Sequence, residues 1–321
     1  MLIMRMQRII WFLILCGIVS AFFVFLFSLP QSVQKYGFET KELTPSFAER
    51  EKGSEKISIL ITGDIMLGRS VQTRSIQNNS YTWPFEKIAD TLHNADVVFI
   101  NLESPFSDPC ALTDSGMTFC TRQEMIAGLT LSGVDVASVA NNHAMNQGKE
   151  GLLFTEAILQ RNDILFVGSK ETPMVIKNVK GTNIAFLAFN DVEQYQDLSQ
   201  LSEETLPLLI VQANNKADIV IVMVHWGEEY TDHPTERQKK FAKLAVDAGA
   251  DIVAGNHPHW TQPLEQYKNG WIVYSHGNFI FDQEWSAKTK QGVVSEWIVE
   301  NKAVVEVKLL PVEIKQFGQV E

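Results

Sequence analysis

A chain of 321 residues can hold one large domain or two ordinary ones, and a hydrophobic content of 45% excludes disorder over most of its length. The formal net charge of -11 gives a surface that repels polyanions, which argues against nucleic acid as a partner. The composition therefore indicates a globular protein that does not bind nucleic acid.

The first predicted element is an uncharged apolar run, Ile9–Leu29. About 20 apolar residues span a bilayer as a helix, and a run that is apolar on every side lacks the polar face of a soluble helix. Two arginines precede the run and no basic residue follows it before Lys35, so the positive-inside rule leaves the N-terminus in the cytoplasm. A cleaved signal peptide is the alternative, but no A-x-A-like cleavage site is evident. We therefore expect residues 1–30 to form a cytoplasmic N-terminus and one transmembrane helix.

Residues 31–56 are polar and show no apolar periodicity, which is typical of a juxtamembrane linker. The predicted topology places this linker and everything after it outside the cytoplasm. No repeat, low-complexity block or Pro/Gly-rich segment divides residues 57–321. We expect that region to be one extracytoplasmic domain, held at the cell membrane by a single pass.

Strands and helices alternate along the predicted domain. Amphipathic stretches over Gly148–Arg161 and Thr235–Ala248 predict helices. Short apolar, β-branched runs predict buried strands at residues 57–62, 97–101, 136–140, 184–190, 219–225, 252–255 and 271–278, and a last strand at 303–314. Alternation of this kind predicts an α/β fold.

Two of the three cysteines, Cys110 and Cys120, lie close together in a polar segment, whereas Cys16 lies in the apolar run. A disulfide between the first two would suit an oxidising compartment outside the cytoplasm. Two free thiols are the alternative that the sequence leaves open.

Polar residues with metal-binding side chains stand where the predicted strands end. In open α/β sheets, ligands bind beyond the carboxyl ends of the strands, so these side chains should converge. Five of the seven histidines belong to this set, which indicates a functional site. Mixed carboxylate, amide and imidazole ligands suit Mn, Fe, Zn or Mg, and a bridging carboxylate could hold two ions about 3.5 to 4 Å apart. The set comprises Asp64, Asn101, Glu103, Asn141, Asn142, His143, His225, His257, His259, His276 and Asn278.

Six segments carry a resemblance to a known family: GDIMLGR at 63–69, NLESP at 101–105, ANNHAMNQG at 140–148, VHWGEEY at 224–230, GNHPHW at 255–260 and SHGNFIFDQ at 275–283. In identity and order they resemble the CapA family of poly-γ-glutamate capsule proteins, over residues 57–314. CapA-like domains are in turn similar to the calcineurin-like metallophosphoesterases. The resemblance implies a metallophosphoesterase-like sandwich of two β-sheets flanked by helices, with a two-metal centre.

The ligands that this resemblance implies for two divalent ions are Asp64, Glu103, Asn142, His225, His257 and His259. Four positions depart from the superfamily pattern. Met66 stands where the first motif has its histidine, and Glu103, or else Asn101, stands where a bridging aspartate is expected. Asn141 and Ala144 replace the glycine and the acid on either side of the Asn-His pair. Replacing an imidazole by a thioether weakens a site for Mn, Fe or Mg.

The resemblance also implies roles around the metals. His143 is the predicted catalytic residue, because it belongs to the matched Asn-His pair and could protonate a leaving group. Arg69 offers a bidentate guanidinium for a carboxylate or phosphate. With Asn101, His276 and Asn278, it is predicted to bind an anionic substrate. Trp260, like the other tryptophans near the motifs, is interpreted as a packing residue.

The sequence leaves functions of different classes open. The first is a membrane-anchored, metal-dependent hydrolase in the synthesis or export of poly-γ-glutamate capsule. The second is a non-catalytic subunit that binds the polymer and hands it on, beside synthase and export subunits in the membrane. A third is a metallo-hydrolase of another anionic cell-envelope phosphoester or amide. No ATP site or ligase loop is evident, so the chain cannot energise polymerisation itself.

Overall fold

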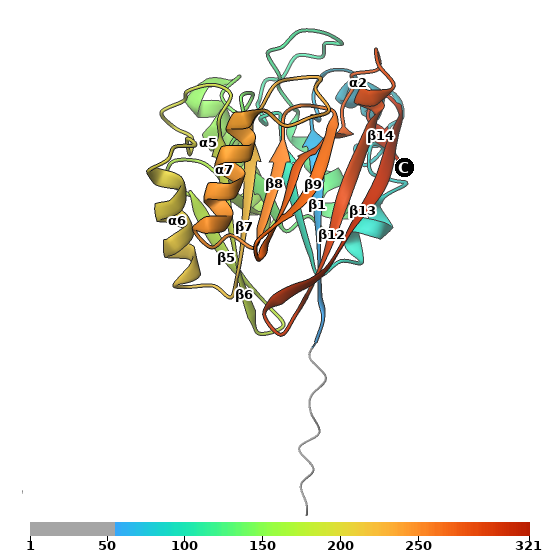
Figure 1. Ribbon diagram of the computed structural model, residues 1–321. Coiled ribbons are helices and arrows are strands. Elements are labelled where there is room, and N and C mark those ends of the chain that lie inside the picture. The colour runs from blue at the N-terminus through green and yellow to red at the C-terminus, as the bar shows by residue number, and fades with distance from the viewer. Residues whose placement is uncertain (1–54) are drawn as a thin grey trace, which may run out of the picture. The chain divides into compact units, whose positions relative to one another are not determined.

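The structure is a computed structural model that describes residues 55–321, which belong to one compact unit. The predicted transmembrane helix and residues 31–54 of the predicted linker lie outside the described residues. Within residues 55–321, no helix is both long and apolar enough to cross a membrane. Figure 1 shows two β-sheets that carry helices on their outer sides.

The first sheet has eight strands in the described region, in the order β14-β13-β12-β1-β2-β3-β4, with β11 paired to β1. The four strands from β1 to β4 run parallel to their neighbours, whereas β12 and β13 add antiparallel pairs. The bounds are β1 Ile57–Ile65, β2 Val97–Leu102, β3 Val136–Ser138, β4 Leu165–Val167, β11 Asn278–Ile280, β12 Gln291–Glu300, β13 Ala303–Gln316 and β14 Gln319–Val320.

The second sheet has six strands, in the order β5-β6-β7-β8-β10-β9. The four central strands run parallel, and each edge strand pairs antiparallel with its neighbour. The bounds are β5 Met174–Val179, β6 Thr182–Asn190, β7 Ile219–His225, β8 Ile252–Asn256, β9 Thr261–Tyr267 and β10 Gly270–His276. Parallel central strands in both sheets mean that each sheet gathers several carboxyl ends at one edge.

Helices cover the outer face of each sheet. The described helices are α2 Arg69–Gln77, α3 Ala89–His93, α4 Ile126–Leu131, α5 Gly148–Arg161, α6 Thr205–Asn214 and α7 Glu236–Asp247. Apolar residues of α4 and α5 pack on the first sheet, and those of α6 and α7 pack on the second. The predicted helix over Gly148–Arg161 is confirmed, and α7 begins after Thr235, whose side chain forms a capping box with Gln238.

Alternate residues of the central strands face opposite layers, because side chains of a strand point to its two faces in turn. Ile59 and Ile61 of β1 pack between the sheets, whereas Leu60 packs toward the helices. Phe99 and Phe186 join the two sheets edge to face, with ring centroids 5.2 Å apart. Each buried side chain of this kind contributes about 1.5 to 3 kcal/mol to stability. The predicted α/β fold with two sheets and flanking helices is confirmed.

The chain passes from one sheet to the other at Gly277. One strand was predicted over residues 271–278, but β10 belongs to the second sheet and β11 belongs to the first. Gly277 between them has a φ of 69°, a left-handed value that favours glycine, and its carbonyl accepts the backbone N–H of Asp64 at 2.9 Å. This turn brings the end of β10 beside the end of β1.

Several strands were not predicted because they lack a continuous apolar run. Strands β5 and β9 lie at sheet edges and expose alternate residues, and β12 alternates polar with apolar side chains.

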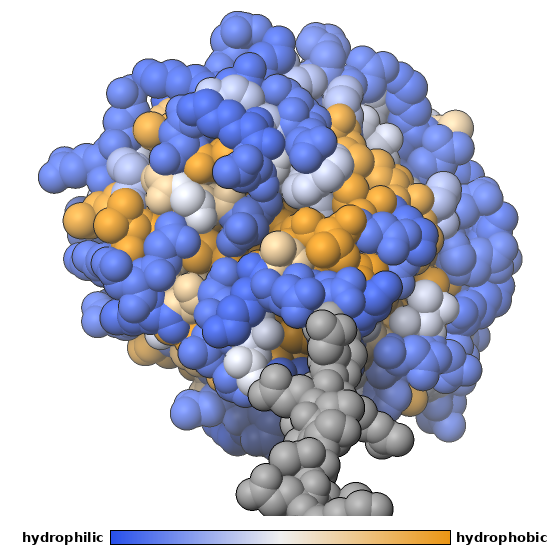
Figure 2. All heavy atoms as spheres, turned by 60° about the horizontal axis from the view of Figure 1, so that its bottom comes forward, coloured by the Kyte–Doolittle hydropathy of each residue, from blue (hydrophilic) through white to orange (hydrophobic). Residues whose placement is uncertain are grey.

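Figure 2 looks onto the face at the bottom of Figure 1, at the opposite end from the tips of the parallel strands. Hydrophobic residues come to the surface there in a patch among hydrophilic ones.

Candidate metal centre

The candidate site lies where the carboxyl ends of β1 and β2 meet those of β7 and β8. Strand register aligns Asp64 with Asn101 on one side and with Asn278 on the other. In the second sheet, His225 ends β7 opposite Asn256 of β8. All five residues are buried, so the two sheets enclose polar groups at their shared edge.

Asp64 is held by donors from three directions. Its Oδ1 accepts the Asn101 amide at 2.8 Å, and its Oδ2 accepts the backbone N–H of His257 at 3.2 Å. The Nδ1 atom of His259 lies 3.0 Å from the same Oδ2. Burial by itself would raise the pKa of the Asp64 carboxyl, but the hydrogen bond and charge of His259 outweigh burial and hold that pKa well below its usual range.

Glu103 follows β2 and has a carboxylate oxygen without a hydrogen-bond partner. Its buried Oε1 lies 3.8 Å from His259 Nε2, 3.9 Å from His225 Nε2 and 4.0 Å from His143 Nε2. Those distances are too long for hydrogen bonds. Two atoms that each ligate an ion at about 2.0 to 2.2 Å lie at most about 4.4 Å apart, so the distances suit a shared ion. Burial, and then the charge of Asp64, raise the pKa of Glu103 well above its ordinary value.

His225 connects the two sheets through amide partners. Its Nε2 lies 2.9 Å from Asn142 Oδ1, and its Nδ1 lies 3.2 Å from Asn101 Nδ2. Burial, reinforced by the charge of His257, lowers the pKa of His225 well below its ordinary value. The imidazole is therefore neutral near pH 7, which is the form that ligates metals.

His143 stands at the edge of the cluster in a fixed orientation. Its ring stacks on Phe119 with centroids 3.9 Å apart, and its Nδ1 lies 2.9 Å from Asn146 Oδ1. That oxygen also accepts the backbone N–H of Phe119 at 2.6 Å, so it acts as an acceptor and the proton of His143 is on Nδ1. The free Nε2 then faces Glu103. Burial lowers the pKa of His143.

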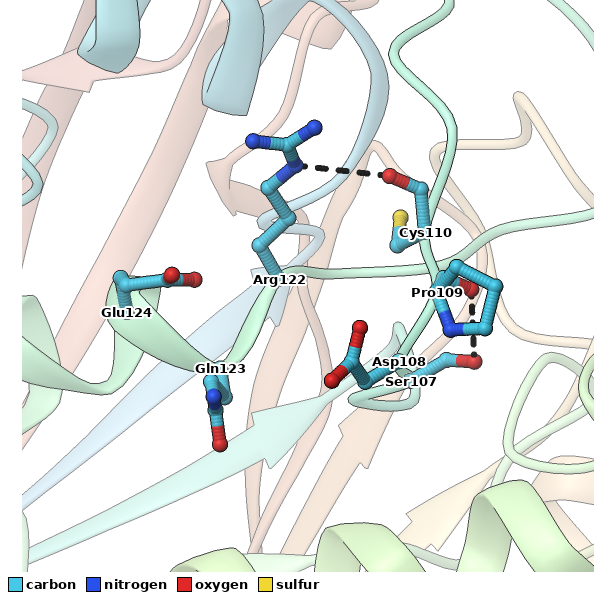
Figure 3. Close-up of a pocket in the computed structure, with 7 residues that line it drawn as sticks. All are labelled: Ser107, Asp108, Pro109, Cys110, Arg122, Gln123 and Glu124. Atoms are coloured by element: carbon cyan, nitrogen blue, oxygen red, sulfur yellow. Dashed lines mark hydrogen bonds between the residues drawn. The ribbon is translucent and has the colours of Figure 1, made fainter.

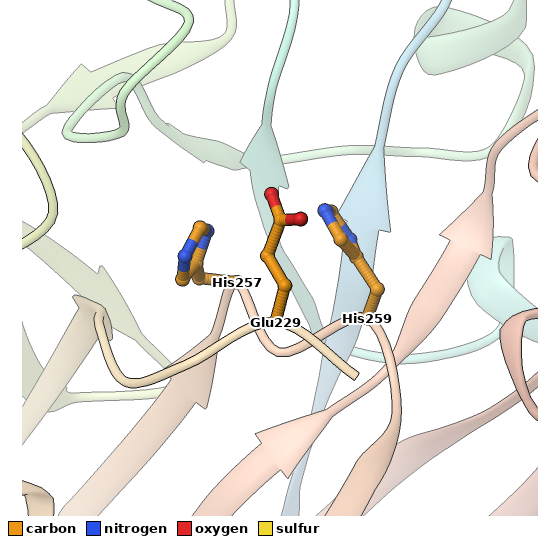
Figure 4. Close-up of side chains that lie close together, drawn as sticks. All are labelled: Glu229, His257 and His259. Carbon is orange, nitrogen blue, oxygen red and sulfur yellow. The ribbon is translucent and has the colours of Figure 1, made fainter. Parts of the chain in front are cut away.

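A second group of possible ligands comprises Glu229, His257 and His259, whose ligand atoms all lie within 4.8 Å of one another. Figure 4 shows the Glu229 carboxylate reaching between the two imidazoles. The buried Nδ1 of His257 has no hydrogen-bond partner among the described residues. Burial, and then the charge of His259, lower the pKa of His257 to about 3. The residues at the site therefore fit divalent cations, because both groups contain a buried polar atom that lacks a partner.

Glu229 was not predicted as a site residue. It stands four residues after His225 in the segment VHWGEEY, where the resemblance drew attention to the histidine alone. An acidic residue that follows a strand end so closely was the available signal, but such residues are also common on surface loops. Only the position of the loop beside His257 distinguishes a possible metal ligand from an ordinary surface residue.

Three predicted substrate-binding residues are enclosed within the protein. His276 is fully buried, with Nδ1 3.0 Å from the Gly255 carbonyl and Nε2 2.8 Å from Ser295 Oγ. Asn278 is also buried and positions His259 through its Oδ1 atom, 2.9 Å from Nδ1. Asn101 bonds to Asp64 inside the cluster. These three residues are therefore buried and bonded to other groups of the protein, and their contact with a substrate stays a prediction.

Arg69 is not a free clamp, because its guanidinium already has partners. It forms an ion pair with Asp282, donates to the Gly116 carbonyl at 2.9 Å and lies over the Phe119 ring at 4.7 Å. Its Nε is buried without a hydrogen-bond partner in the described region. Each terminal nitrogen also keeps a second N–H, so the contact of Arg69 with an anion stays a prediction.

Cys110 and Cys120 form a disulfide, as one of the two alternatives predicted. The loop that they close ends next to Phe119, so the disulfide fixes the ring on which His143 stacks. A surface pocket of about 260 Å³ lies beside the disulfide (Figure 3), where Arg122 Nε donates to the Cys110 carbonyl at 3.4 Å. None of the predicted metal ligands lines this pocket.

Three aromatic side chains and one lysine form a rim next to His259. This rim cluster comprises Tyr230, Trp260, Trp285 and Lys288. The Tyr230 ring lies 4.7 Å from that of Trp285 and 5.9 Å from His259. Lys288 Nζ lies 4.3 Å from the centre of the Trp260 ring. Trp285 is 61% exposed, which is unusual for so large an apolar side chain. Trp260 is half-buried at this rim.

The sequence matches a known family model over most of this domain. The model described as bacterial capsule synthesis protein PGA_cap matches residues 58–283. The chain is 32% identical over 289 residues to the capsule biosynthesis protein CapA of Bacillus anthracis, covering 83% of this chain and 70% of the relative. It is 30% identical over 276 residues to the PGA biosynthesis protein CapA of Bacillus subtilis, covering 81% and 72%.

Solved structures share the fold at low sequence identity. A phosphatase from Mycoplasma pneumoniae has a TM-score of 0.57 at 13% identity, covering 82% of this chain and 95% of that structure. A hypothetical protein from Thermus thermophilus has a TM-score of 0.54 at 16% identity, covering 81% and 100%. At these identities the likeness concerns the fold alone.

Proposed function

Because the chain belongs to the bacterial capsule synthesis protein family PGA_cap, we propose that it acts in the synthesis or export of a poly-γ-glutamate capsule, through a metal-dependent hydrolytic site. The two Bacillus relatives carry capsule and PGA biosynthesis in their names, which supports this setting. The hydrolysed bond is an amide of the polymer or another ester or amide of the cell envelope.

One observation carries the hydrolytic part of the proposal. Glu103 Oε1 is buried and unpartnered within 3.8 to 4.0 Å of three imidazole nitrogens, in a cluster that also contains Asp64. An unpaired buried carboxylate oxygen costs free energy unless something compensates it. A divalent cation among these atoms provides that compensation.

The proposed ligands divide between the two sheets, with Asp64, Glu103 and Asn142 from the first and His225, His257 and His259 from the second. When bound, a divalent cation supplies Lewis acidity toward a phosphoryl or acyl oxygen and lowers the pKa of water. The protein supplies the orientation. Asn278 fixes the His259 ring through Nδ1 at 2.9 Å, which leaves Nε2 facing Glu103.

His143 is the residue that we propose to move a proton. Asn146 and Phe119 hold its ring so that Nε2 faces the cluster, 4.0 Å from Glu103 Oε1. With the ring proton on Nδ1, Nε2 carries a lone pair, so it can accept a proton and then pass it to a leaving group without being required as a ligand.

The rim cluster offers a surface for the polymer. Poly-γ-glutamate alternates methylene groups with free carboxylates, so aromatic faces and a cation suit it. Trp260 and Trp285 supply the faces, and Lys288 supplies the charge. This local cation offsets an otherwise acidic protein of net charge -11.

The proposed location is the outer face of the cell membrane. The disulfide supports an oxidising compartment, and the apolar run Ile9–Leu29 supports an anchor that leaves the domain outside. Synthase and export subunits of the capsule machinery are the proposed partners. Protease added to spheroplasts should degrade the domain, and full protection together with the cytosol would contradict this location.

A non-catalytic polymer-binding subunit is the second candidate, favoured by Met66. This residue stands where the superfamily has a histidine, and its sulfur accepts the Gly68 N–H at 3.1 Å within the hydrophobic core. One ligand of the superfamily pattern is therefore absent from this position.

Substitution of His257 separates the two candidates. In the native host, His257→Ala should abolish both metal uptake and capsule formation, whereas the exposed His233→Ala should leave both intact as a matched control. Metal content is measured on the purified chain and capsule by polymer assay. Retained capsule after loss of metal would favour the non-catalytic subunit.

A further inference from the structure

The loop after β7 places a carboxylate at the open side of the metal cluster. Glu229 is half-buried, and its carboxylate lies with the imidazoles of His257 and His259 in a group of ligand atoms within 4.8 Å of one another. The other group, Asp64, Glu103 and His225, is fully buried. Glu229 is thus the one member of the two groups that solvent can reach directly.

The backbone holds this carboxylate in place. The Tyr230 N–H donates to the Pro258 carbonyl at 2.8 Å, which ties the loop of Glu229 to the loop of the two histidines. Tyr230 and both histidines have positive φ values, 61°, 96° and 58°, which side chains other than glycine adopt at a cost. Strained backbone that persists at three neighbouring positions indicates a functional constraint.

The Tyr230 side chain adds a second tie. Its hydroxyl accepts the Gln283 amide at 3.3 Å, which joins the loop of Glu229 to the loop after β11. Supports of this kind hold metal ligands in position. His257, whose buried Nδ1 has no partner among the described residues, belongs to the same group as Glu229, and that nitrogen needs a partner of its own.

The site lacks one histidine ligand of the superfamily pattern. Met66 occupies the position of a superfamily histidine, and its thioether is turned into the core against the Gly68 N–H. A hard cation such as Mn²⁺ prefers a carboxylate to a thioether. A carboxylate that enters from another strand end can therefore restore the coordination that the thioether does not supply, and it adds one negative charge.

We propose that Glu229 is a ligand of the metal centre, supplied by the loop after β7 in place of the histidine that Met66 replaces. This inference rests on the proposed function, because it requires that the cluster bind divalent cations. It goes further by naming a ligand outside the superfamily pattern and by giving the site a third carboxylate, with Asp64 and Glu103.

Manganese titration of the purified full-length chain tests the proposal. After removal of metal with a chelator, Mn²⁺ alone is titrated by calorimetry into the wild-type chain and the variants Glu229→Gln and Glu228→Gln. Glu228 is the matched control, because it is the adjacent residue and is exposed. Circular dichroism and the melting temperature of each apo variant establish that it folds.

The wild-type chain should bind two Mn²⁺ ions, and Glu229→Gln should weaken one of them by at least about 10-fold while the other stays unchanged. Glu228→Gln should match the wild type, and Tyr230→Phe, which removes only the hydroxyl that accepts the Gln283 amide, should have a smaller effect. If Glu229→Gln fails to fold, Glu229→Asp keeps the charge, shortens the reach and should weaken the same ion. Two unchanged Mn²⁺ sites in a folded Glu229 variant would overturn the inference but leave the proposed function standing. A wild-type chain that binds no Mn²⁺ would overturn both.

Discussion

The two sheets contribute different chemistry to one site. The eight-stranded sheet supplies the two fully buried carboxylates, Asp64 of β1 and Glu103 after β2. The six-stranded sheet supplies the imidazoles of His225, His257 and His259, and through the loop after β7 the half-buried Glu229. Burial shifts the pKa values of carboxylates and imidazoles in opposite directions: it raises the pKa of Glu103 and lowers the pKa of His257 to about 3. Neither sheet holds a complete set of metal ligands, so the site forms only because the two sheets pack together.

Removing the Glu103 carboxylate should have the largest effect, because it takes away the unpartnered oxygen that lies 3.8 to 3.9 Å from two imidazoles of the opposite sheet. For Glu103→Gln we expect the affinity for Mn²⁺ to fall at least about 100-fold, as measured by calorimetry. The exposed Glu124→Gln serves as its control. Equal affinity of the two variants would mean that Glu103 is not a ligand.

Two buried histidines of the second sheet distinguish a ligand from a structural residue. His225→Ala should lower the affinity for Mn²⁺ by about 10- to 100-fold. His276→Ala should keep that affinity but lose about 1 to 3 kcal/mol of unfolding free energy, since it leaves the Gly255 carbonyl without its partner. Calorimetry and urea unfolding of both variants provide the comparison. If His276→Ala lost Mn²⁺ affinity and His225→Ala kept it, His276 and not His225 would be the ligand.

The buried histidines also predict how stability depends on pH. Burial lowers the pKa of His276 to about 4, from an ordinary value of 6.5. Between these values the unfolded chain binds a proton that the folded chain does not, so stability is fully present above pH 6.5 and is lost as pH falls toward 4. His276 alone accounts for about 3 kcal/mol. In urea unfolding at pH 7 and pH 4.5, His276→Gln should show a smaller pH difference than the wild type; an equal difference would contradict this assignment.

The disulfide should matter least to the metal site, since it lies in neither sheet. Replacing Cys110 and Cys120 together by serine removes a loop closure of about ten residues, worth at most about 3 kcal/mol. We expect a lower melting temperature and a looser ring stack between Phe119 and His143, with Mn²⁺ affinity unchanged. A loss of bound metal would show that the loop supports the ligands as well.

Much of this arrangement was predictable from the sequence. The strand-end rule identified Asp64, Glu103 and His225 because each follows an apolar run, and the family resemblance is confirmed. The rule does not predict the burial of His276 and Asn278, which also stand at strand ends. Their chain turns at Gly277 into the other sheet, and such a turn buries both residues without leaving a signal in apolar periodicity.

What the sequence could not reveal depends on contacts between distant segments. Glu229 becomes a candidate ligand only because its loop is tied to Pro258, and Trp285 becomes part of a rim only because its loop lies against Tyr230. The disulfide was one of two alternatives until the positions of both cysteines were known. Long-range packing decides these cases, and hydrophobic pattern carries no information about it.

The central claim is that a divalent cation binds between the two sheets. Anomalous diffraction from crystals grown with Mn²⁺ tests it directly, because the signal locates the ion relative to its ligands. The account predicts a peak next to Glu103 Oε1 that is bordered by oxygen from the first sheet and by imidazole nitrogen from the second. Crystals of the folded protein that show no peak there, or peaks only at exposed carboxylates, would contradict it.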